Sequence, residues 1–198
     1  MVFVRAYNTT LPATSNDIYG LRVSADNAVI GGAISICTEL KHQNTPRVTT
    51  NEQDRYLVVW DHEYSSTDHD IYGQLLDVNG NKVGGYISIS TWTQNDTHPA
   101  VAANGATGEW LAVWQRASTE GAQIWGRRWG SGLVDYTFEV AAWTWWDCMT
   151  PAVVADIPGY LIAYEGDSTS DPTVKQHIYG RMWWPEAVYL PLILRNQS

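Results

Sequence analysis

The sequence is poor in positive charge. Its 198 residues include 12 lysines and arginines against 21 aspartates and glutamates, which gives a formal net charge of −9 at pH 7. Surfaces that bind nucleic acid neutralise phosphates with clustered Lys and Arg side chains. We therefore expect no nucleic-acid partner.

Long apolar runs, helical periodicity and a rich cysteine content are also absent. No stretch approaches the roughly 18 apolar residues that a membrane-spanning helix needs, and no window keeps the helical apolar period of about 3.6 residues. Nucleophile triads, phosphate-binding glycine loops and dinucleotide motifs are missing as well. The two cysteines, Cys37 and Cys148, are expected in connections between repeats, and two thiols are favoured over a disulfide. These absences exclude a membrane span and a helical fold.

What the sequence does contain is a tetrapeptide that occurs four times, with spacings of 53, 53 and 54 residues. The copies are Asp17-Ile18-Tyr19-Gly20, Asp70-Ile71-Tyr72-Gly73, Gln123-Ile124-Trp125-Gly126 and His177-Ile178-Tyr179-Gly180. Aromatic, apolar runs precede them at 3–7, 56–60, 110–114 and 160–164. Such self-similarity at a fixed period indicates a repeat protein.

Each repeat consists of short segments rich in Val, Ile, Tyr and Trp that Gly, Asn, Asp and Pro separate, a composition typical of strands. Pro46, Pro99 and Pro151 are each expected to open the first strand of a unit. Residues 77–81 have the composition of a hairpin turn between the third and fourth strands. Repeated four-stranded units of about 50 residues predict an all-β fold, a four-bladed β-propeller.

The predicted propeller is a single domain over residues 1–198. Its blades are expected at 1–45 plus 191–196, at 46–98, at 99–150 and at 151–190. Because 191–196 has the same form as 46–51, the C-terminal strand would complete the first blade and close the ring. In the alternative interpretation, 187–194 is the outer strand of the last blade and the first blade lacks its inner strand.

Three segments of the second repeat carry a family resemblance: Leu57-Val58-Val59-Trp60, Asp70-Ile71-Tyr72-Gly73-Gln74 and Asn79-Gly80. The pattern is similar to that of bacterial β-propeller repeat proteins, and it covers nearly the whole chain. The resemblance implies a propeller in an exported protein, so we expect an extracellular or cell-surface location. It implies no catalytic residues, because the pattern describes the scaffold.

The chain has eleven tryptophans. Those at a repeat position, such as Trp60 and Trp114, are interpreted as core residues between blades. Others fall in the connections between blades, which a propeller places on the same face as the loops between second and third strands. The ligand-binding residues expected on this face are Trp92, Trp143, Trp145, Trp146, Asp61, His62, Asp96 and Asp147.

Aromatic rings stack on the C–H faces of sugars, and carboxylates and imidazoles bond sugar hydroxyls. The face therefore predicts a non-catalytic, lectin-like module with carbohydrate as the favoured ligand. The alternatives are a structural or protein-interaction propeller and a glycoside hydrolase, which would need two carboxylates across a cleft. The candidate carboxylates are Asp61, Glu63, Glu165 and Asp167, and nothing in the sequence selects a pair.

Metal binding is a further hypothesis. His62, Asp68 and His69 crowd imidazole and carboxylate groups into one expected loop, but their spacing matches no established site. Asp167 and Asp171 begin and end a segment of alternating oxygens that suits Ca²⁺ but lacks the glycine and distal glutamate of calcium loops. We therefore expect no cofactor.

Overall fold

The computed structural model describes residues 2–7, 15–51, 53–130, 136–142, 146–155, 159–168, 177–183 and 191–193. These residues form fifteen strands in four antiparallel sheets, as the strand composition predicts. No helix long and apolar enough to cross a membrane is found among them.

The strands follow one another across each sheet in chain order. The first sheet contains β1 (Val2–Tyr7), β2 (Asn16–Val23) and β3 (Val29–Cys37). The second contains β4 (Gln43–Thr50), β5 (Arg55–Ser65), β6 (Asp68–Asp77) and β7 (Lys82–Ser90). The third contains β8 (Asp96–Asn104), β9 (Glu109–Arg116), β10 (Gln123–Gly130) and β11 (Tyr136–Ala141). The fourth contains β12 (Trp146–Ala155), β13 (Tyr160–Ser168), β14 (His177–Trp183) and β15 (Pro191–Ile193).

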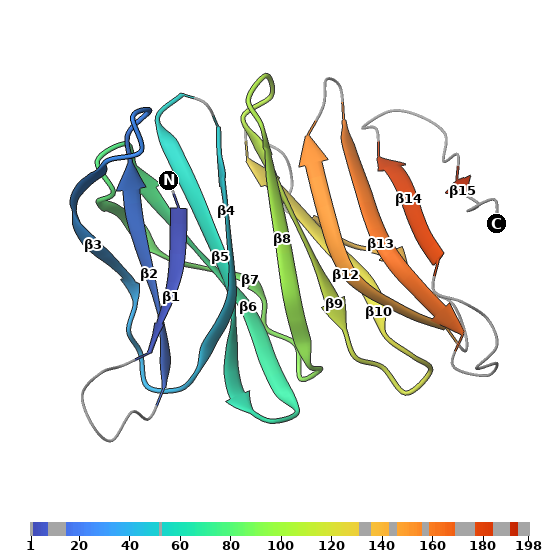
Figure 1. Cartoon of the computed structure of the whole chain (residues 1–198). Helices are drawn as coiled ribbons and strands as arrows, with labels where there is room; N and C mark the ends of the chain where they lie inside the picture. Colours follow the sequence, from blue (N-terminus) through green and yellow to red (C-terminus); the bar gives the residue numbers. More distant parts are fainter. Residues whose placement is uncertain are drawn as a thin grey trace.

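The four sheets lie side by side in chain order, with the first and the last at opposite ends of the array (Figure 1). Neighbouring sheets meet along the strands that begin them, because β4 contacts β8 and β8 contacts β12. The chain thus repeats one antiparallel unit and stacks each unit against the next.

The pairing of strands confirms the repeat for three of its four copies. The residue that ends each aromatic run faces the third residue of the following tetrapeptide. The pairs are Trp60 with Tyr72, Trp114 with Trp125, and Tyr164 with Tyr179.

The first copy departs from this register. Val4, and not Tyr7, lies opposite Tyr19, so the match of 3–7 to the other aromatic runs is wrong by three residues. Eight residues, 8–15, separate β1 from β2, whereas residues 66 and 67 alone separate β5 from β6. Because the length of the connection helps to fix hairpin register, a longer one permits another alignment.

The prolines do not open their strands as predicted. Pro46, Pro99 and Pro151 lie three to five residues inside β4, β8 and β12, where the pairing register shifts. The residues before them have positive φ angles: Thr45 at 44°, His98 at 53° and Thr150 at 44°. Proline has no N–H to give to a ladder, so within a strand it is tolerated where pairing is interrupted by a bulge.

The C-terminal strand does not close a ring. β15 pairs with β14, with Leu192 opposite Gly180, and so completes the fourth sheet. The first sheet therefore has three strands, as the alternative interpretation predicted. Pairing with the sheet that directly precedes it in the chain requires a shorter loop than pairing across the array, and so a smaller loss of chain entropy.

Among the residues that the structure describes, three buried clusters form the core, one at each junction between neighbouring sheets. In β5, Val58 and Trp60 pack against the first sheet, whereas Leu57 and Val59 pack against the third. The nearly continuous apolar run of this strand is explained by burial on both faces. Trp60 and Trp114 are fully buried, as their repeat position predicted.

The cysteines lie in strands and not in connections between repeats. Cys37 ends β3 and packs at the junction of the first and second sheets, and Cys148 of β12 packs at the junction of the third and fourth. They form no disulfide, as expected.

The glycine that ends the tetrapeptide gives a test of this packing. A Cβ on Gly73 would lie 3.1 Å from Ile89 Cδ1 and 3.2 Å from Leu57 Cδ1, whereas a Cβ on Gly85 would meet nothing within 4 Å. We expect Gly73→Ala to lower the free energy of unfolding by about 1 to 3 kcal/mol, because it overpacks the core.

The matched control, Gly85→Ala, is expected to be neutral or to stabilise the protein by up to about 1 kcal/mol. Urea denaturation of both variants measures the difference. Equal stabilities for the two would show that the tetrapeptide glycine is not required by packing.

Candidate functional site

One end of the array gathers the described connections between sheets, 38–42 and 91–95, and the described turns that join second to third strands, 66–67 and 117–122 (Figure 1). Residues 91–95 join β7 to β8, and 117–122 join β9 to β10. Because antiparallel strands alternate in direction, these segments emerge at the same end. This is the end for which the sequence predicted a binding face.

A cavity of about 570 Å³ opens there. Its lining combines two indole rings, one guanidinium and several amides and hydroxyls. The lining residues are Thr67, Trp92, Gln94, Asn95, Arg116, Ala117, Ser118, Thr119, Gln123 and Trp125. Trp92 is 60% exposed, which is unusual for so large an apolar side chain and leaves its ring accessible to a ligand.

Arg116 is the charged group at the base of this cavity, and a buried network holds it. Its Nε and Nη2 donate to the two carboxylate oxygens of Asp96, both at 2.7 Å, and Nη2 also donates to Ser90 Oγ at 2.9 Å. Ser90 Oγ in turn donates to Asp96 Oδ2 at 2.6 Å. Asp96 is fully buried and Arg116 nearly so, so the bidentate pair is shielded from solvent.

Three tryptophans surround the same guanidinium. Its central carbon lies 4.6 Å from the ring centre of Trp125, 5.3 Å from that of Trp92 and 5.8 Å from that of Trp114. Trp125 is further fixed by its Nε1, which donates to Gln123 Oε1 at 2.9 Å. Cation–π attraction therefore orders the rings of Trp92 and Trp125 about one fixed charge.

The structure places the predicted ligand-binding residues in different settings. Trp92 lines the cavity, but Asp96 lies beneath it, committed to Arg116. Asp147 accepts a hydrogen bond from the backbone N of Ala122 at 2.6 Å and so holds the β9–β10 connection. Trp143, Trp145 and the side chain of Trp146 lie outside the described residues.

The predicted catalytic carboxylates do not lie in the expected loops. Asp61 and Glu63 are part of β5 in the second sheet, and Glu165 and Asp167 are part of β13 in the fourth. The third sheet stands between them. These strands extend further toward the turns than the sequence indicated, because Asp61 and its neighbours pair with β6 almost to the strand end.

Asp61 has structural partners of its own. It is buried, accepts a hydrogen bond from Thr45 Oγ1, and contacts His69 Nδ1 at 3.1 Å. The hydrogen bond with Asp61 raises the pKa of His69. Asp61 therefore joins β4 to β6 across the second sheet.

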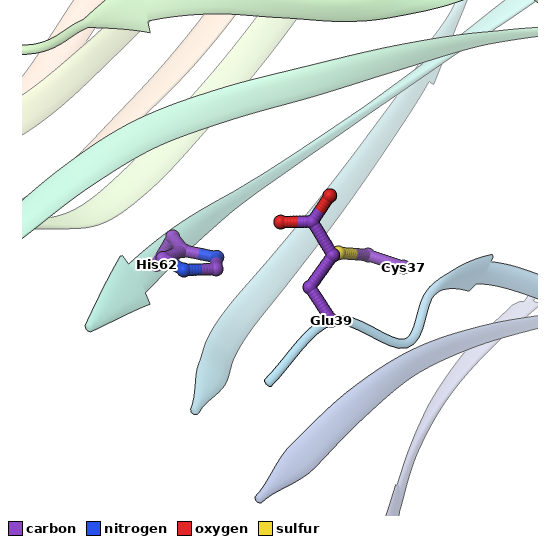
Figure 2. A group of neighbouring side chains, drawn as sticks. All are labelled: Cys37, Glu39 and His62. Atoms are coloured by element: carbon purple, nitrogen blue, oxygen red, sulfur yellow. The ribbon is translucent and has the colours of Figure 1, made fainter. Parts of the chain in front are cut away.

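Of the three metal ligands predicted from the loop sequence, only His62 lies in a group of potential ligand atoms in the part of the chain that the structure describes. His62 is buried beside Cys37 and Glu39, and the potential ligand atoms of these three residues lie within 4.8 Å of one another (Figure 2). Burial lowers the pKa of His62 and raises that of the Cys37 thiol. Asp68 and His69 are not part of this group.

Only one of the two predicted calcium ligands lies among the described residues. Asp167 is described in β13, and Asp171 lies outside the described residues.

Sequence reasoning missed Arg116 and the amides of Gln94 and Asn95 as cavity residues. Arg116 could have been found from its position, because it directly follows the apolar run 110–114 and Gln115. If the strand is still buried at this point, the charge of Arg116 needs a buried partner. No local signal identified Asp96 as that partner, because 20 residues separate the two.

The buried ion pair gives a direct prediction. Asp96→Ala leaves the guanidinium of Arg116 without its carboxylate, so we expect a loss of about 3 to 5 kcal/mol of stability. Asp54→Ala, which breaks the exposed pair of Asp54 with Arg55, should cost about 1 kcal/mol or less. Chemical denaturation compares the variants, and equal losses would contradict the structural role given to Asp96.

Asp70 gives a prediction for pH. Burial first, and then the charges of Asp68 and Asp96, raise its pKa from 3.8 to about 6. The folded protein therefore holds this proton more tightly than the unfolded chain, and the corresponding stability is lost as pH rises from about 4 to about 6. Asp70→Asn should gain stability relative to the unmodified protein over this interval, as thermal unfolding at pH 4, 5, 6 and 7 would measure. A difference that does not change with pH would contradict the raised pKa.

No family model matches the sequence, and no curated protein matches it. Solved structures do resemble its fold. A Hadza microbial sialidase, Hz136, matches with a TM-score of 0.55 at 11% identity, over 71% of this chain and 35% of the sialidase chain. An alpha-L-arabinofuranosidase from Lactobacillus brevis matches with a TM-score of 0.56 at 12% identity, over 88% of this chain and 65% of that enzyme.

A thermostable family-43 glycoside hydrolase matches with a TM-score of 0.53 at 7% identity, over 100% of this chain and 76% of that one. The chain thus spans about a third of the sialidase and just under two thirds of the arabinofuranosidase. At sequence identities this low, the matches show a similarity of fold and nothing more. The stacked sheets of this chain therefore resemble the folds of these enzymes.

Proposed function

We propose that the chain is a non-catalytic carbohydrate-binding module and that the cavity at Trp92, Trp125 and Arg116 holds the sugar. The observation that carries this proposal is the placement of two tryptophans around a guanidinium in a cavity of about 570 Å³. Sites for small ligands typically occupy about 300 to 1,000 Å³ and combine aromatic walls with a few polar groups.

The lining suits the two kinds of surface that a sugar presents. The exposed ring of Trp92 offers a plane for the apolar C–H face of a pyranose or furanose. Hydroxyls on the sugar edge would bond the amides of Gln94 and Asn95 and the hydroxyl of Ser118, all of which line the cavity. The module would then recognise both the apolar face and the hydroxyl-bearing edge of one sugar ring.

The network beneath the cavity prepares it for binding. Asp96 and Ser90 fix Arg116, and Gln123 fixes the indole of Trp125. Groups that are already ordered lose little conformational entropy when a ligand arrives. Asp96 therefore contributes by positioning Arg116, although it does not line the cavity.

Binding is favoured over hydrolysis by the chemistry of the lining. Glycoside hydrolases of the common kind need two carboxyl groups, about 5 to 9.5 Å apart, on either side of the scissile bond. Among the described residues that line this cavity there is no aspartate or glutamate. The similar folds of a sialidase and an arabinofuranosidase support a relation to carbohydrate without requiring the reaction.

We extend the proposal to the setting of the module. The four sheets are taken as blades of a β-propeller, in line with the repeat and with the fold of the similar structures. An extracellular or cell-surface location fits a protein whose ligand is a glycan. The low content of Lys and Arg agrees with a partner other than nucleic acid.

A glycan-array screen that includes arabinofuranosyl and sialyl termini tests the function. We expect the protein to bind at least one class of glycan and Trp92→Ala to weaken that binding by about 5-fold or more, since aromatic stacking contributes roughly 1 kcal/mol or more. Met182→Ala, an exposed apolar change in the fourth sheet, is the control and should bind like the unmodified protein.

Product analysis with the bound glycan separates the two activities. Binding without release of sugar supports the module, whereas turnover would replace it with the hydrolase. Failure to bind any glycan, with circular dichroism unchanged, would overturn the proposal in favour of a structural or protein-interaction repeat.

A further inference from the structure

We propose that Cys37, Glu39 and His62 form a binding site for Zn²⁺ at the junction of the first and second sheets. Cys37 ends β3, Glu39 lies in the connection to β4, and His62 is on β5 (Figure 2). In the figure the carboxylate of Glu39 lies on the side of Cys37 that faces the imidazole of His62. Three different ligand types thus converge from two sheets.

The separations are close to those that one ion requires. The ligand atoms of the three residues lie within 4.8 Å of one another. Ligands bound at about 2.0 to 2.3 Å from a tetrahedral ion are separated by roughly 3.3 to 3.8 Å. Closure by about one ångström is within reach of Glu39, because its exposed side chain can adopt another staggered rotamer.

The donor set selects the kind of metal. Thiolate and imidazole favour Zn²⁺ and similar transition ions, whereas Ca²⁺ and Mg²⁺ take oxygen ligands. Three protein ligands leave one position of a tetrahedral ion for water, as in zinc sites that are not purely structural. Cys37 and His62 are buried and Glu39 is exposed, so the open side of the site lies on the side of the carboxylate.

Comparison with the next repeat supports the convergence of these side chains. By strand pairing, Cys37, Gln43 and His62 occupy the positions that Ser90, Asp96 and Arg116 occupy one unit later. The later three are joined by hydrogen bonds of 2.6 to 2.9 Å.

In the earlier unit these positions hold no cation–carboxylate pair. A thiol and an imidazole stand where the hydroxyl and the guanidinium stand, and Glu39 reaches in from the connection. A divalent ion would supply the positive charge that Arg116 supplies in the third sheet.

Gln43 provides an independent sign of a missing partner. It is fully buried and lies opposite His62 on the same face of the sheet. Its Nε2 donates to the backbone oxygens of Glu39 at 3.3 Å and Lys41 at 2.8 Å, but among the described residues its Oε1 accepts no hydrogen bond. An ordered water molecule in this junction would be a donor for this oxygen.

The surrounding contacts hold the ligands in place. The imidazole of His62 packs against the rings of Tyr64 at 4.8 Å and Tyr72 at 5.8 Å, and these two tyrosines share a hydrogen bond of 3.0 Å. The connection that carries Glu39 is anchored because Lys41 Nζ donates to Tyr64 O at 3.0 Å. Ordered surroundings of this kind orient metal ligands.

Titration of Zn²⁺ into protein that has been treated with EDTA tests the site. We expect one Zn²⁺ per chain by calorimetry, a rise in the melting temperature with zinc, and an absorption band of thiolate-bound cobalt when Co²⁺ replaces zinc. Cys37→Ser should remove the band. Glu39→Gln should weaken zinc binding by at least about tenfold, which is what loss of even an outer partner of a zinc ligand brings.

Two matched controls separate ligation from a general effect of substitution. Cys148→Ser changes the other buried thiol, and Glu139→Gln changes an exposed carboxylate in β11. Both should bind zinc as the unmodified protein does. Because Glu39 is exposed, Glu39→Gln is expected to fold even if Cys37→Ser does not.

The proposal is overturned if zinc binds with equal affinity to the unmodified protein and to Glu39→Gln, or if the cobalt complex has no thiolate band. None of these measurements uses a glycan, so the outcome is independent of the proposed carbohydrate site.

Discussion

Each central sheet of this protein is buried on both faces. β5 turns Val58 and Trp60 to one neighbour and Leu57 and Val59 to the other. A strand in this position has no face left for water, so its sequence must be apolar along nearly its whole length. The polar residues are displaced to the strand ends, where the two proposed sites lie.

Equivalent positions at the strand ends carry side chains of different chemistry in different repeats. The same three positions carry Cys37, Gln43 and His62 at one junction and Ser90, Asp96 and Arg116 at the next. At the third junction the equivalent positions hold Ala141, Cys148 and Gly166.

Each set solves the burial of polar groups in its own way. The second set pairs opposite charges in a closed network. The third set avoids charge altogether: a Cβ on Gly166 would lie 2.6 Å from the ring of Tyr179, so that ring occupies the space. The first set brings a thiol and an imidazole together with no carboxylate on the same three positions, and the proposed Zn²⁺ would be their common partner.

The repeat made much of the fold predictable. A fixed spacing of the tetrapeptide predicted four similar all-β units, and the apolar runs predicted which tryptophans are buried. These inferences held because strand composition and burial on both faces are local properties of the chain. The proline bulges were not predicted, because a proline at a strand start and one at a bulge look alike in a sequence. For the C-terminal strand the sequence left two pairings open, and β15 follows the alternative one.

The repeating unit, its strands and the end of the array at which polar and aromatic side chains gather follow from local patterns of residues. Which of these side chains contact one another does not follow from such patterns. Asp96 meets Arg116 across 20 residues, and Cys37 meets His62 across 25. These contacts join separate strands or separate sheets, so they depend on register and stacking, which become fixed only when the chain folds.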